Sequence, residues 1–332
     1  MADGKRVGIA GATGAVGLEM LRVLDERAFP VASLTAMASD RGGDRTVAFG
    51  DEDVRVVPLS EKSLEGLDVV LFATSAAVSS EFVPLAVEAG AVAVDNSRAF
   101  RMDPEVPLVV PEVNPGAMES HKGVIANPNC STIQIVLPLE VVRREAGLVR
   151  VVASTYQSVS GTGLAAMDEL IDQTRAVLEG EPVVSAVYPT QIGFNCLPHI
   201  DDFDDDGNTR EETKMVNETR KILGVPDLSI TVTCVRVPVL RSHAVAMNVE
   251  TVHPLDPDEL RPLLDSSPGM RVLDDPSSAG YPTQVDSAGG DDVWVGRIRR
   301  DESVRNGLWM WVVADNLRKG AALNAVQIAE LL

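Results

Sequence analysis

The chain has 332 residues, enough for about two domains that each bury a hydrophobic core. Hydrophobic residues make up 45% of it and charged residues 23%, which excludes a disordered or fibrous protein. The net charge of −20 excludes a general nucleic-acid binder, because such a field repels phosphate backbones. Only 6 of the 29 basic residues are lysine, so a site for a small anion is expected to rely on arginine.

The three cysteines, Cys130, Cys196 and Cys234, show neither CxxC nor Cys/His spacing. This pattern predicts no disulfide framework and no metal site, and it is typical of a reducing compartment. No charged and apolar leader is recognisable, and no apolar run approaches the roughly 18 residues that span a bilayer. We therefore expect a cytoplasmic protein with no membrane partner.

From about residue 5 to residue 128, short β-branched runs alternate with helical segments. This order predicts a parallel sheet with crossover helices, and hence an α/β domain. Strands are expected at 6–10, 33–38, 69–72, 91–94 and 124–126, and helices at 15–27 and near 80–89.

After residue 149 longer alternating runs predict an α+β domain with a mixed or antiparallel sheet. An apolar helix over 131–145 connects the two parts, and an acidic helix is expected at 211–223. The amphipathic end of the chain, 316–332, is expected to pack back on the first domain. The predicted strands of the second part are 149–157, 229–237, 244–252, 293–299 and 308–314.

A glycine-rich loop, Gly-Ala-Thr-Gly-Ala-Val-Gly over 11–17, lies where the first strand meets the first helix. Glycines there let the backbone approach a pyrophosphate, whose charge is held by free N–H groups and the helix dipole. The GxxGxxG spacing is a weaker match than GxGxxG, and a tight turn without a ligand is the alternative. The expected dinucleotide contacts in this loop are Gly11, Thr13, Gly14, Ala15 and Val16.

The end of the second strand distinguishes between the two nicotinamide cofactors. Ser39 and Arg41 suit the 2′-phosphate of NADP, whereas Asp40 suits the ribose hydroxyl of NAD. We predict that the cofactor is NADP, with contacts from Ser39 and Arg41. Because of Asp40, NAD is the alternative cofactor. An ordinary polar turn is a third interpretation.

Asn127-Pro-Asn-Cys130-Ser places a thiol at the start of an apolar helix. The helix dipole and the unpaired N–H groups favour a thiolate and can accept an oxyanion. A small buried cysteine is the alternative. The turn before Cys130 exposes the helix start, which favours a nucleophile.

Eight stretches, in order along nearly the whole chain, resemble the aspartate-semialdehyde dehydrogenases. The resemblance implies a Rossmann-type NADP-binding domain over 1–128, completed by the helix at 316–332, and a catalytic and dimerisation domain over 129–315. The stretches are GATGAVG at 11, DNSRAFR at 95, NPNCST at 127, YQSVSGTG at 156, NCLPHID at 195, EETKMVNETRKIL at 211, RVPVLRSH at 236 and DNLRKGAALNAVQIAE at 315.

The resemblance also implies an oxidoreductase. Its reaction would be NADPH-dependent reductive dephosphorylation of L-aspartyl 4-phosphate to L-aspartate 4-semialdehyde, with phosphate as the other product. That step belongs to the biosynthesis of lysine through diaminopimelate, and of threonine, methionine and isoleucine. The implied assembly is a homodimer or a dimer of dimers.

Matched position by position, the resemblance implies that Cys130 forms a thioacyl enzyme, Gln157 orients the substrate, and His243 is the general acid/base. These roles agree with the chemistry, since an acyl phosphate requires a soft nucleophile and a group that moves protons. The same comparison implies that the nicotinamide lies near Ser160, Gly161, Gly163 and Asn316.

Arg236 resembles the substrate-carboxylate clamp, because a guanidinium meets a carboxylate with two parallel hydrogen bonds. Glu211 would accept from the substrate ammonium. Lys214 and Arg98 would hold the phosphate, with Asn129 as a neutral donor. For Glu211 and Lys214, a solvated i,i+3 ion pair on a charged helix is the alternative.

Arg241, two residues before His243, departs from the family pattern. We expect it either to lower the His243 pKa or to point to solvent.

Three rival functions are open. An N-acetyl-glutamyl-phosphate reductase-like enzyme is disfavoured by Glu211, since its substrate has no free ammonium. A non-catalytic NADP-binding paralogue is disfavoured by the joint presence of Cys130, Gln157, Arg236 and His243. A short-chain reductase or nucleotide-sugar epimerase requires a Tyr-x-x-x-Lys pair, which none of the three tyrosines forms.

Overall fold

The computed structural model describes residues 4–39 and 45–332, which divide into two compact units. Unit 1 runs to Asn129 and also contains Ala321–Leu332, and unit 2 is Cys130–Gly320. The predicted domain boundaries lie after residues 128 and 315, and the roles given to those domains stay predictions.

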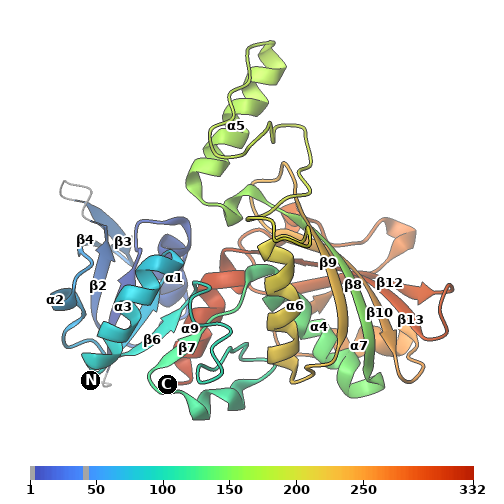
Figure 1. Ribbon diagram of the computed structural model, residues 1–332, viewed down its shortest axis with the longest axis horizontal. Coiled ribbons are helices and arrows are strands. Elements are labelled where there is room, and N and C mark those ends of the chain that lie inside the picture. The colour runs from blue at the N-terminus through green and yellow to red at the C-terminus, as the bar shows by residue number, and fades with distance from the viewer. Residues whose placement is uncertain (1–3, 40–44) are drawn as a thin grey trace. The chain divides into compact units, whose positions relative to one another are not determined.

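Unit 1 is built on a seven-stranded sheet in the order β3-β4-β2-β1-β5-β6-β7 (Figure 1). All neighbouring strands run parallel except the edge pair β3–β4, which is antiparallel. This is the expected parallel sheet with crossover helices. The strands are β1 (Lys5–Ala10), β2 (Val31–Ala38), β3 (Thr46–Phe49), β4 (Glu52–Pro58), β5 (Val69–Phe72), β6 (Val92–Asp95) and β7 (Val124–Ala126).

Helices cover both faces of this sheet, so its central strands are apolar throughout; all four residues of β5 are buried. One core cluster joins the sheet to α1 and to the C-terminal α9, and a second joins it to α2 and α3. The predicted helix 316–332 is split into a π-helical turn, Arg318–Ala322, and α9. The helices are α1 (Ala15–Glu26), α2 (Glu61–Leu64), α3 (Ala76–Glu88) and α9 (Leu323–Glu330).

Unit 2 contains a mixed six-stranded sheet in the order β11-β12-β13-β10-β8-β9. Strand β8 pairs parallel with β9 and antiparallel with β10, which fits the expected α+β domain. The strands are β8 (Leu148–Gln157), β9 (Ser229–Arg236), β10 (His243–Thr251), β11 (Met270–Val272), β12 (Val293–Asp301) and β13 (Gly307–Ala314).

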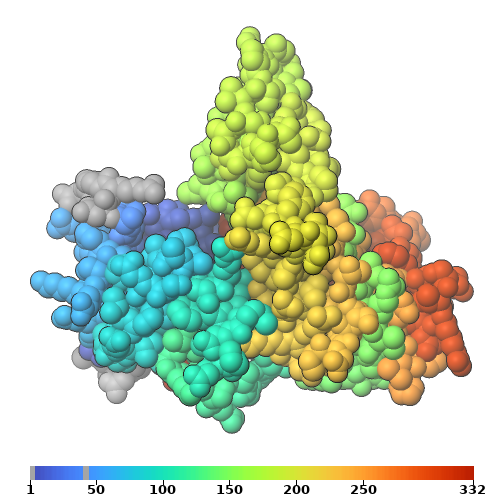
Figure 2. All heavy atoms as spheres, in the orientation of Figure 1, coloured from blue at the N-terminus to red at the C-terminus, as the bar shows by residue number. Residues whose placement is uncertain are grey.

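Three helices, α4 (Cys130–Ala146), α6 (Arg210–Leu223) and α7 (Pro257–Asp265), pack on the strands of unit 2. The short α8 is Gln284–Ser287. Helix α5 (Leu164–Glu179) projects away from that sheet (Figures 1 and 2). Its return loop is fastened by the buried Glu169, whose carboxylate accepts from the backbone N–H groups of residues 186–188.

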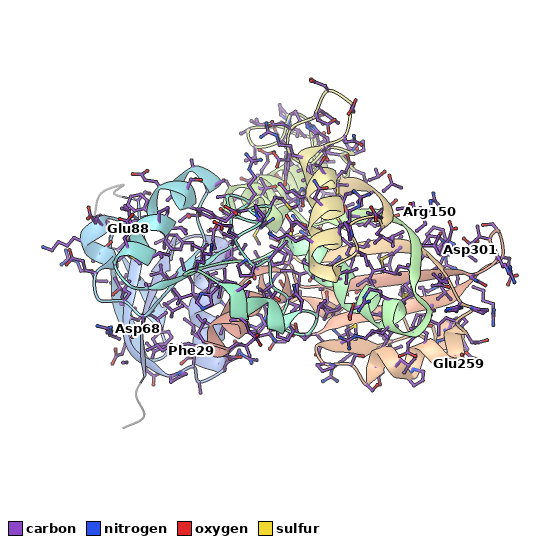
Figure 3. The ribbon with its side chains drawn as sticks, turned by 60° about the horizontal axis from the view of Figure 1, so that its bottom comes forward. Phe29, Asp68, Glu88, Arg150, Glu259 and Asp301 are labelled. Carbon is purple, nitrogen blue, oxygen red and sulfur yellow. The ribbon has the colours of Figure 1, made fainter. Side chains whose placement is uncertain are left out.

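Exposed ion pairs also connect neighbouring strands. Arg6 and Asp68 pair at the amino ends of β1 and β5, and Arg150 on β8 pairs with Glu250 on β10; Asp68 and Arg150 are labelled in Figure 3. Such pairs contribute little to stability, so the buried side chains set the strand register. Within the described residues no helix has the length and apolarity of a membrane span.

Candidate active site

Unit 1 has a pocket of about 390 Å³ at the carboxyl ends of β1, β2 and β5. The chain passes from β1 to β2 on one side and later places β5 on the other side of β1. Ligands of open α/β sheets bind at such a switch in strand order. The lining residues are Gly11, Thr13, Gly14, Ala38, Ser39, Leu59, Ala73, Thr74, Ser75, Val78 and Phe82.

Two glycines of the loop are required by the packing itself. Gly11 has a positive φ of 87°, and a Cβ there would lie 2.3 Å from the Ala73 carbonyl oxygen. A Cβ on Gly17 would lie 2.2 Å from the Gly11 carbonyl oxygen. Gly14 is the N-cap of α1 and makes no side-chain cap. The bare backbone next to an uncapped helix start therefore fits a dinucleotide phosphate.

Of the predicted cofactor residues in unit 1, Gly11, Thr13, Gly14 and Ser39 line this pocket. Ala15 and Val16, the first two residues of α1, are not among the residues that line it. Asp40 and Arg41 lie outside the described residues.

Sequence reasoning missed the β5 side of the pocket, where Thr74 and Ser75 follow the buried strand. The sequence did contain a signal for this wall. Two hydroxyl residues directly follow the apolar run of β5, the strand next to β1.

In unit 2 the three cysteines occupy different environments. Cys130 is partly exposed and is the first residue of α4. A Cβ on Gly320 would lie 3.0 Å from the Cys130 Cβ, so the segment after Asn316 passes close to the thiol-bearing residue. Cys196 is exposed, and Cys234 is buried, where burial raises its pKa. Only Cys130 combines access with a helix N-terminus, as a nucleophile requires.

Gln157, Glu211 and Lys214 form one buried hydrogen-bonded group. The Gln157 Nε2 donates to Glu211 Oε1 at 3.0 Å, and Lys214 Nζ lies 3.1 Å from Glu211 Oε2 and 2.6 Å from Asp201 Oδ2. Burial opposes the Lys214 charge, but Glu211 and Asp201 outweigh it and raise the Lys214 pKa. The i,i+3 ion pair of the alternative interpretation forms, but it is not solvated, because the side chains of Lys214 and Glu211 are only 20% and 7% exposed.

Arg236 ends β9 directly beside Gln157, the last residue of β8. Its Nη1 donates to the Ser158 carbonyl oxygen at 2.7 Å, while its buried Nε has no partner. Within the described residues no carboxylate pairs with Arg236. A buried guanidinium with an unused donor is suited to an anionic group of a ligand.

His243 begins β10 and is completely buried. The Ser158 backbone N–H donates to its Nδ1 at 3.0 Å, and its Nε2 has no partner. Burial and the Arg236 charge lower the His243 pKa to about 3, against an opposing effect of Glu211. A Cβ on Gly161 would lie 3.0 Å from Arg236 Nη1 and 3.2 Å from His243 Nε2. The tips of both side chains therefore approach one point.

Asn316 is buried, and its Oδ1 accepts three hydrogen bonds. The donors are Ser158 Oγ and Ser160 Oγ, both at 3.1 Å, and Ser242 N at 2.9 Å. Ser242 has a positive φ of 73°, and its carbonyl oxygen accepts from Gln284 Nε2 at 2.7 Å. The Oδ1 atom of Asn316 thus connects Ser242, which precedes His243, to the segment that contains Ser158 and Ser160.

Both expectations for Arg241 are wrong. Its Nε lies 2.6 Å from Oδ2 of the fully buried Asp315, and its side chain is only 23% exposed. The adjacent carboxylate balances the charge of Arg241, and the His243 pKa is lowered by burial and by Arg236 instead.

The structure therefore brings together Gln157, Glu211, Lys214, Arg236 and His243 within unit 2. Arg98 and Asn129 belong to unit 1, where Arg98 is exposed and Asn129 is buried. Of the described residues, no three His, Cys, Asp or Glu side chains are grouped so that they could hold a metal ion.

Comparisons with known proteins show which family the chain belongs to. Residues 6–121 match the family model of the semialdehyde dehydrogenase NAD binding domain, and residues 139–319 match that of the semialdehyde dehydrogenase dimerisation domain. The chain is 49% identical over 333 residues to the aspartate-semialdehyde dehydrogenase of Aquifex aeolicus, covering 99% of this chain and 98% of the relative. It is 46% identical over 344 residues to that of Bacillus subtilis, covering 100% of this chain and 98% of the relative.

Solved structures give the same result. The crystal structure of aspartate semialdehyde dehydrogenase II from Vibrio cholerae complexed with ASA superposes with a TM-score of 0.97 at 47% identity, covering 100% of this chain and 98% of that one. With both family domains matched and full-length relatives at this identity, the chain belongs to the aspartate-semialdehyde dehydrogenase family.

Proposed function

We propose that this chain reduces L-aspartyl 4-phosphate to L-aspartate 4-semialdehyde with NADPH and releases phosphate, using Cys130 as the nucleophile. Its family and the matched NAD binding domain support an NADP-dependent oxidoreductase. The observation that carries the substrate assignment is the buried pair of opposite charges, Glu211 and Arg236, on either side of Gln157.

The first step is acyl transfer to sulfur. Cys130 Sγ attacks the acyl carbon, the bond from that carbon to the phosphate oxygen breaks, and phosphate leaves with the bonding electrons. The resulting thioester remains on Cys130. When bound, NADPH supplies the hydride that reduces this thioester to the aldehyde level. The bond from the acyl carbon to Cys130 Sγ then breaks, which releases the aldehyde and returns the thiolate.

The chain's own residues hold the substrate. Arg236 has a buried Nε donor for the α-carboxylate, and Glu211 offers a buried carboxylate for the ammonium. Gln157 bonds to Glu211 and orients the reacting acyl group. We assign the phosphate to Lys214, with Arg98 and Asn129 as further donors.

We assign the cofactor to the pocket of unit 1 and to the segment around Gly161. Gly11, Thr13, Gly14 and Ser39 would contact the adenosine and phosphate half, with Arg41 on the 2′-phosphate. Ser160, Gly161, Gly163 and Asn316 would contact the nicotinamide half.

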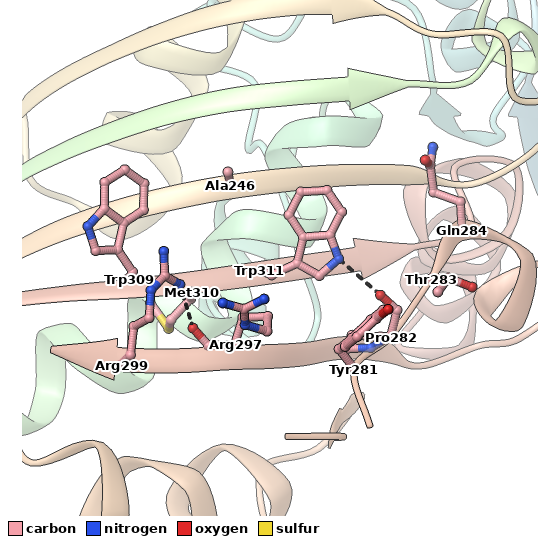
Figure 4. Close-up of a pocket in the computed structure, with 10 residues that line it drawn as sticks. All are labelled: Ala246, Tyr281, Pro282, Thr283, Gln284, Arg297, Arg299, Trp309, Met310 and Trp311. Atoms are coloured by element: carbon pink, nitrogen blue, oxygen red, sulfur yellow. Dashed lines mark hydrogen bonds between the residues drawn. The ribbon is translucent and has the colours of Figure 1, made fainter. Parts of the chain in front are cut away.

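We also propose a homodimer, or a dimer of such dimers, formed through the second sheet. Trp309 and Trp311 alternate along β13 with buried residues, and with Arg297 and Arg299 of β12 they line a hollow of about 370 Å³ (Figure 4). The dimerisation-domain match spans this sheet. Aromatic and arginine side chains are enriched at protein interfaces. Sedimentation should show a dimer or tetramer for the wild type and a smaller species for Trp309→Asp.

The test of the function is the reverse reaction. Aspartate 4-semialdehyde should reduce NADP over many turnovers only when phosphate is present, and faster than NAD is reduced. N-acetylglutamate semialdehyde, which has no ammonium, should be a poor substrate. If the N-acetyl compound reacts as well or better, the chain is a reductase of the N-acetyl-glutamyl-phosphate type. If neither compound reacts, the catalytic proposal fails.

A further inference from the structure

Thr74, in the β5 wall of the unit 1 pocket, has a hydroxyl whose direction is set by two buried residues. Its Oγ1 lies 2.8 Å from Ser79 Oγ, and either atom of this pair could be the donor. Ser79 lies in α3 and is fully buried, and its Oγ donates to Asp95 Oδ1 at 2.7 Å. A hydroxyl has one hydrogen to donate. Because Ser79 gives its hydrogen to Asp95, the hydrogen between Thr74 and Ser79 belongs to Thr74.

The Asp95 carboxylate prevents a reversal of these bonds. It is fully buried at the end of β6, and a carboxylate only accepts. Its Oδ1 also accepts from the Ser97 backbone N–H at 3.0 Å, and its Oδ2 accepts from Ser97 Oγ at 2.7 Å. A backbone N–H is always a donor, so Oδ1 stays an acceptor. Thr74 therefore donates to Ser79 and Ser79 to Asp95, and Thr74 Oγ1 can offer a ligand only a lone pair.

The neighbouring Ser75 has the opposite property. It is the N-cap of α3, and its Oγ accepts from the Val78 N–H at 3.4 Å. Its own hydrogen can therefore turn to an acceptor on a ligand, such as a phosphate oxygen. Beside Thr74 a phosphate oxygen is disfavoured, because two acceptors would face each other, whereas a ligand O–H is favoured. The two hydroxyl residues of this wall thus recognise different groups.

The place of Thr74 in the sheet indicates which ligand hydroxyl it meets. Ser39 follows β2 and Thr74 follows β5, and these strands lie on opposite sides of β1. The Thr74 methyl carbon is 3.3 Å from the position of a Cβ on Gly11, so Thr74 borders the glycine loop. In such sheets the adenosine ribose lies at the end of the second strand and the diphosphate at the start of the first helix. The β5 side then receives the ribose beyond the diphosphate, which carries the nicotinamide.

We propose that Thr74 accepts a hydrogen bond from a hydroxyl of the nicotinamide-bearing ribose, and that Ser79 and Asp95 fix Thr74 as an acceptor for it. Thr74 contacts the cofactor, and Ser79 and Asp95 are positioning residues. The inference rests on the proposed function for the identity of the cofactor, NADP. It gives the pocket of unit 1 a side chain that distinguishes a ligand hydroxyl from a ligand phosphate.

Equilibrium binding to variants of Thr74 tests the contact without catalysis. Thr74→Val keeps the shape but removes the acceptor, so the Kd for NADP, measured by calorimetry, should rise about three- to tenfold. Thr74→Ser keeps the hydroxyl and should bind within about twofold of the wild type. Adenosine 2′,5′-bisphosphate, which lacks the nicotinamide ribose, should bind the wild type and Thr74→Val alike. An unchanged Kd for NADP in Thr74→Val, or an equal loss for the bisphosphate, overturns the proposal.

A changed ligand tests the direction of the bond. A dinucleotide with fluorine in place of the nicotinamide ribose hydroxyls cannot donate there. The preference for NADP over this analogue, as a ratio of Kd values, should be about three- to tenfold smaller in Thr74→Val than in the wild type. An equal preference in the two proteins contradicts a bond donated to Thr74.

The role of the buried pair is tested with the same two ligands. Ser79→Ala lets the Thr74 hydrogen turn into the pocket, so the preference for NADP over the fluorinated analogue should shrink. Ser80→Ala, at an exposed position of the same helix, is the matched control and should keep the wild-type preference. An undiminished preference in Ser79→Ala, at an unchanged melting temperature, would remove Ser79 and Asp95 from the positioning role.

The wild type separates this inference from the proposed function. A wild-type chain that binds neither NADP nor NAD would contradict the proposed function and, with it, the assigned contact. A wild-type chain that binds NADP as tightly as Thr74→Val does would contradict the contact alone and leave the proposed function standing.

Discussion

The pocket of unit 1 is lined by glycines, hydroxyl residues and apolar side chains, whereas the cluster of unit 2 consists of buried charged and polar side chains. In unit 1, Gly11 is required because a Cβ would meet the Ala73 carbonyl oxygen. In unit 2, Glu211 is buried with both carboxylate oxygens bonded, and Arg236 is also buried. Backbone and shape therefore make the first site, and side-chain chemistry makes the second. An added side-chain atom should therefore disturb the site of unit 1 by steric clash, whereas a changed charge should disturb the site of unit 2.

Cys130→Ser should give the largest difference between the two sites, because it should abolish catalysis in unit 2 and leave cofactor binding in unit 1 intact. A hydroxyl is a poor nucleophile toward an acyl phosphate, so we expect kcat to fall by at least about a thousandfold, or 4 kcal/mol. NADP binding, followed by fluorescence titration, should stay within about twofold. Cys196→Ser, at an exposed position, is the matched control and should keep wild-type activity. A comparable loss in the control would mean that the nucleophile is misassigned.

Arg236→Lys tests whether unit 2 recognises the substrate carboxylate. Lysine keeps the charge but loses the two-pronged donor, so kcat/KM for aspartate 4-semialdehyde should fall about ten- to a hundredfold. A small aldehyde without a carboxylate should react slowly and be affected little. An equal loss on both aldehydes, with a lowered melting temperature, would assign Arg236 a structural role.

The buried His243 makes stability depend on pH. Native His243 has a pKa of about 3, whereas the unfolded chain binds a proton there below about 6.5. Because the unfolded state then binds more protons, acid favours unfolding, and this part of the stability is lost as the pH falls from about 6.5 toward 3. Melting temperatures measured across this interval should fall less steeply for His243→Gln than for the wild type. Parallel curves would mean that His243 is protonated in the native state.

Arg41→Ala should have the smallest effect and acts on unit 1 alone. A guanidinium makes charge-assisted bonds to a 2′-phosphate that a 2′-hydroxyl cannot match, so KM should rise several-fold more for NADP than for NAD. Steady-state kinetics with both cofactors measure this difference. Asp40→Ala should strengthen NADP binding if that carboxylate faces the pocket. Equal changes for both cofactors would show that Arg41 only shapes the turn.

Local patterns were sufficient to predict the parallel sheet, its crossover helices and the mixed second sheet. The edge pair β3–β4 was missed because its strands are half-exposed, although Gly50 with a positive φ marks the turn between them. Helix α7 was missed despite a clear signal, since Asp256 caps it and Pro257 is its first residue.

The candidate site could be predicted only in part. Glycine spacing indicated the pocket of unit 1, because adjacent residues build that loop. The bonds of Ser158 and Asn316 to each other, and of Ser158 to His243, join segments 158 and 85 residues apart, so no local pattern contains them. The pairing of Arg241 with Asp315 was missed for the same reason.

The covalent intermediate on Cys130 tests the central claim most directly. Wild-type protein is mixed with aspartate 4-semialdehyde and NADP in the absence of phosphate, and its intact mass is measured before and after phosphate is added. We expect one aspartyl group per chain, located on the peptide that contains Cys130, lost when phosphate is added and absent from Cys130→Ser. An unmodified wild-type chain that still turns over, or an adduct on Cys196 or Cys234, would contradict the account.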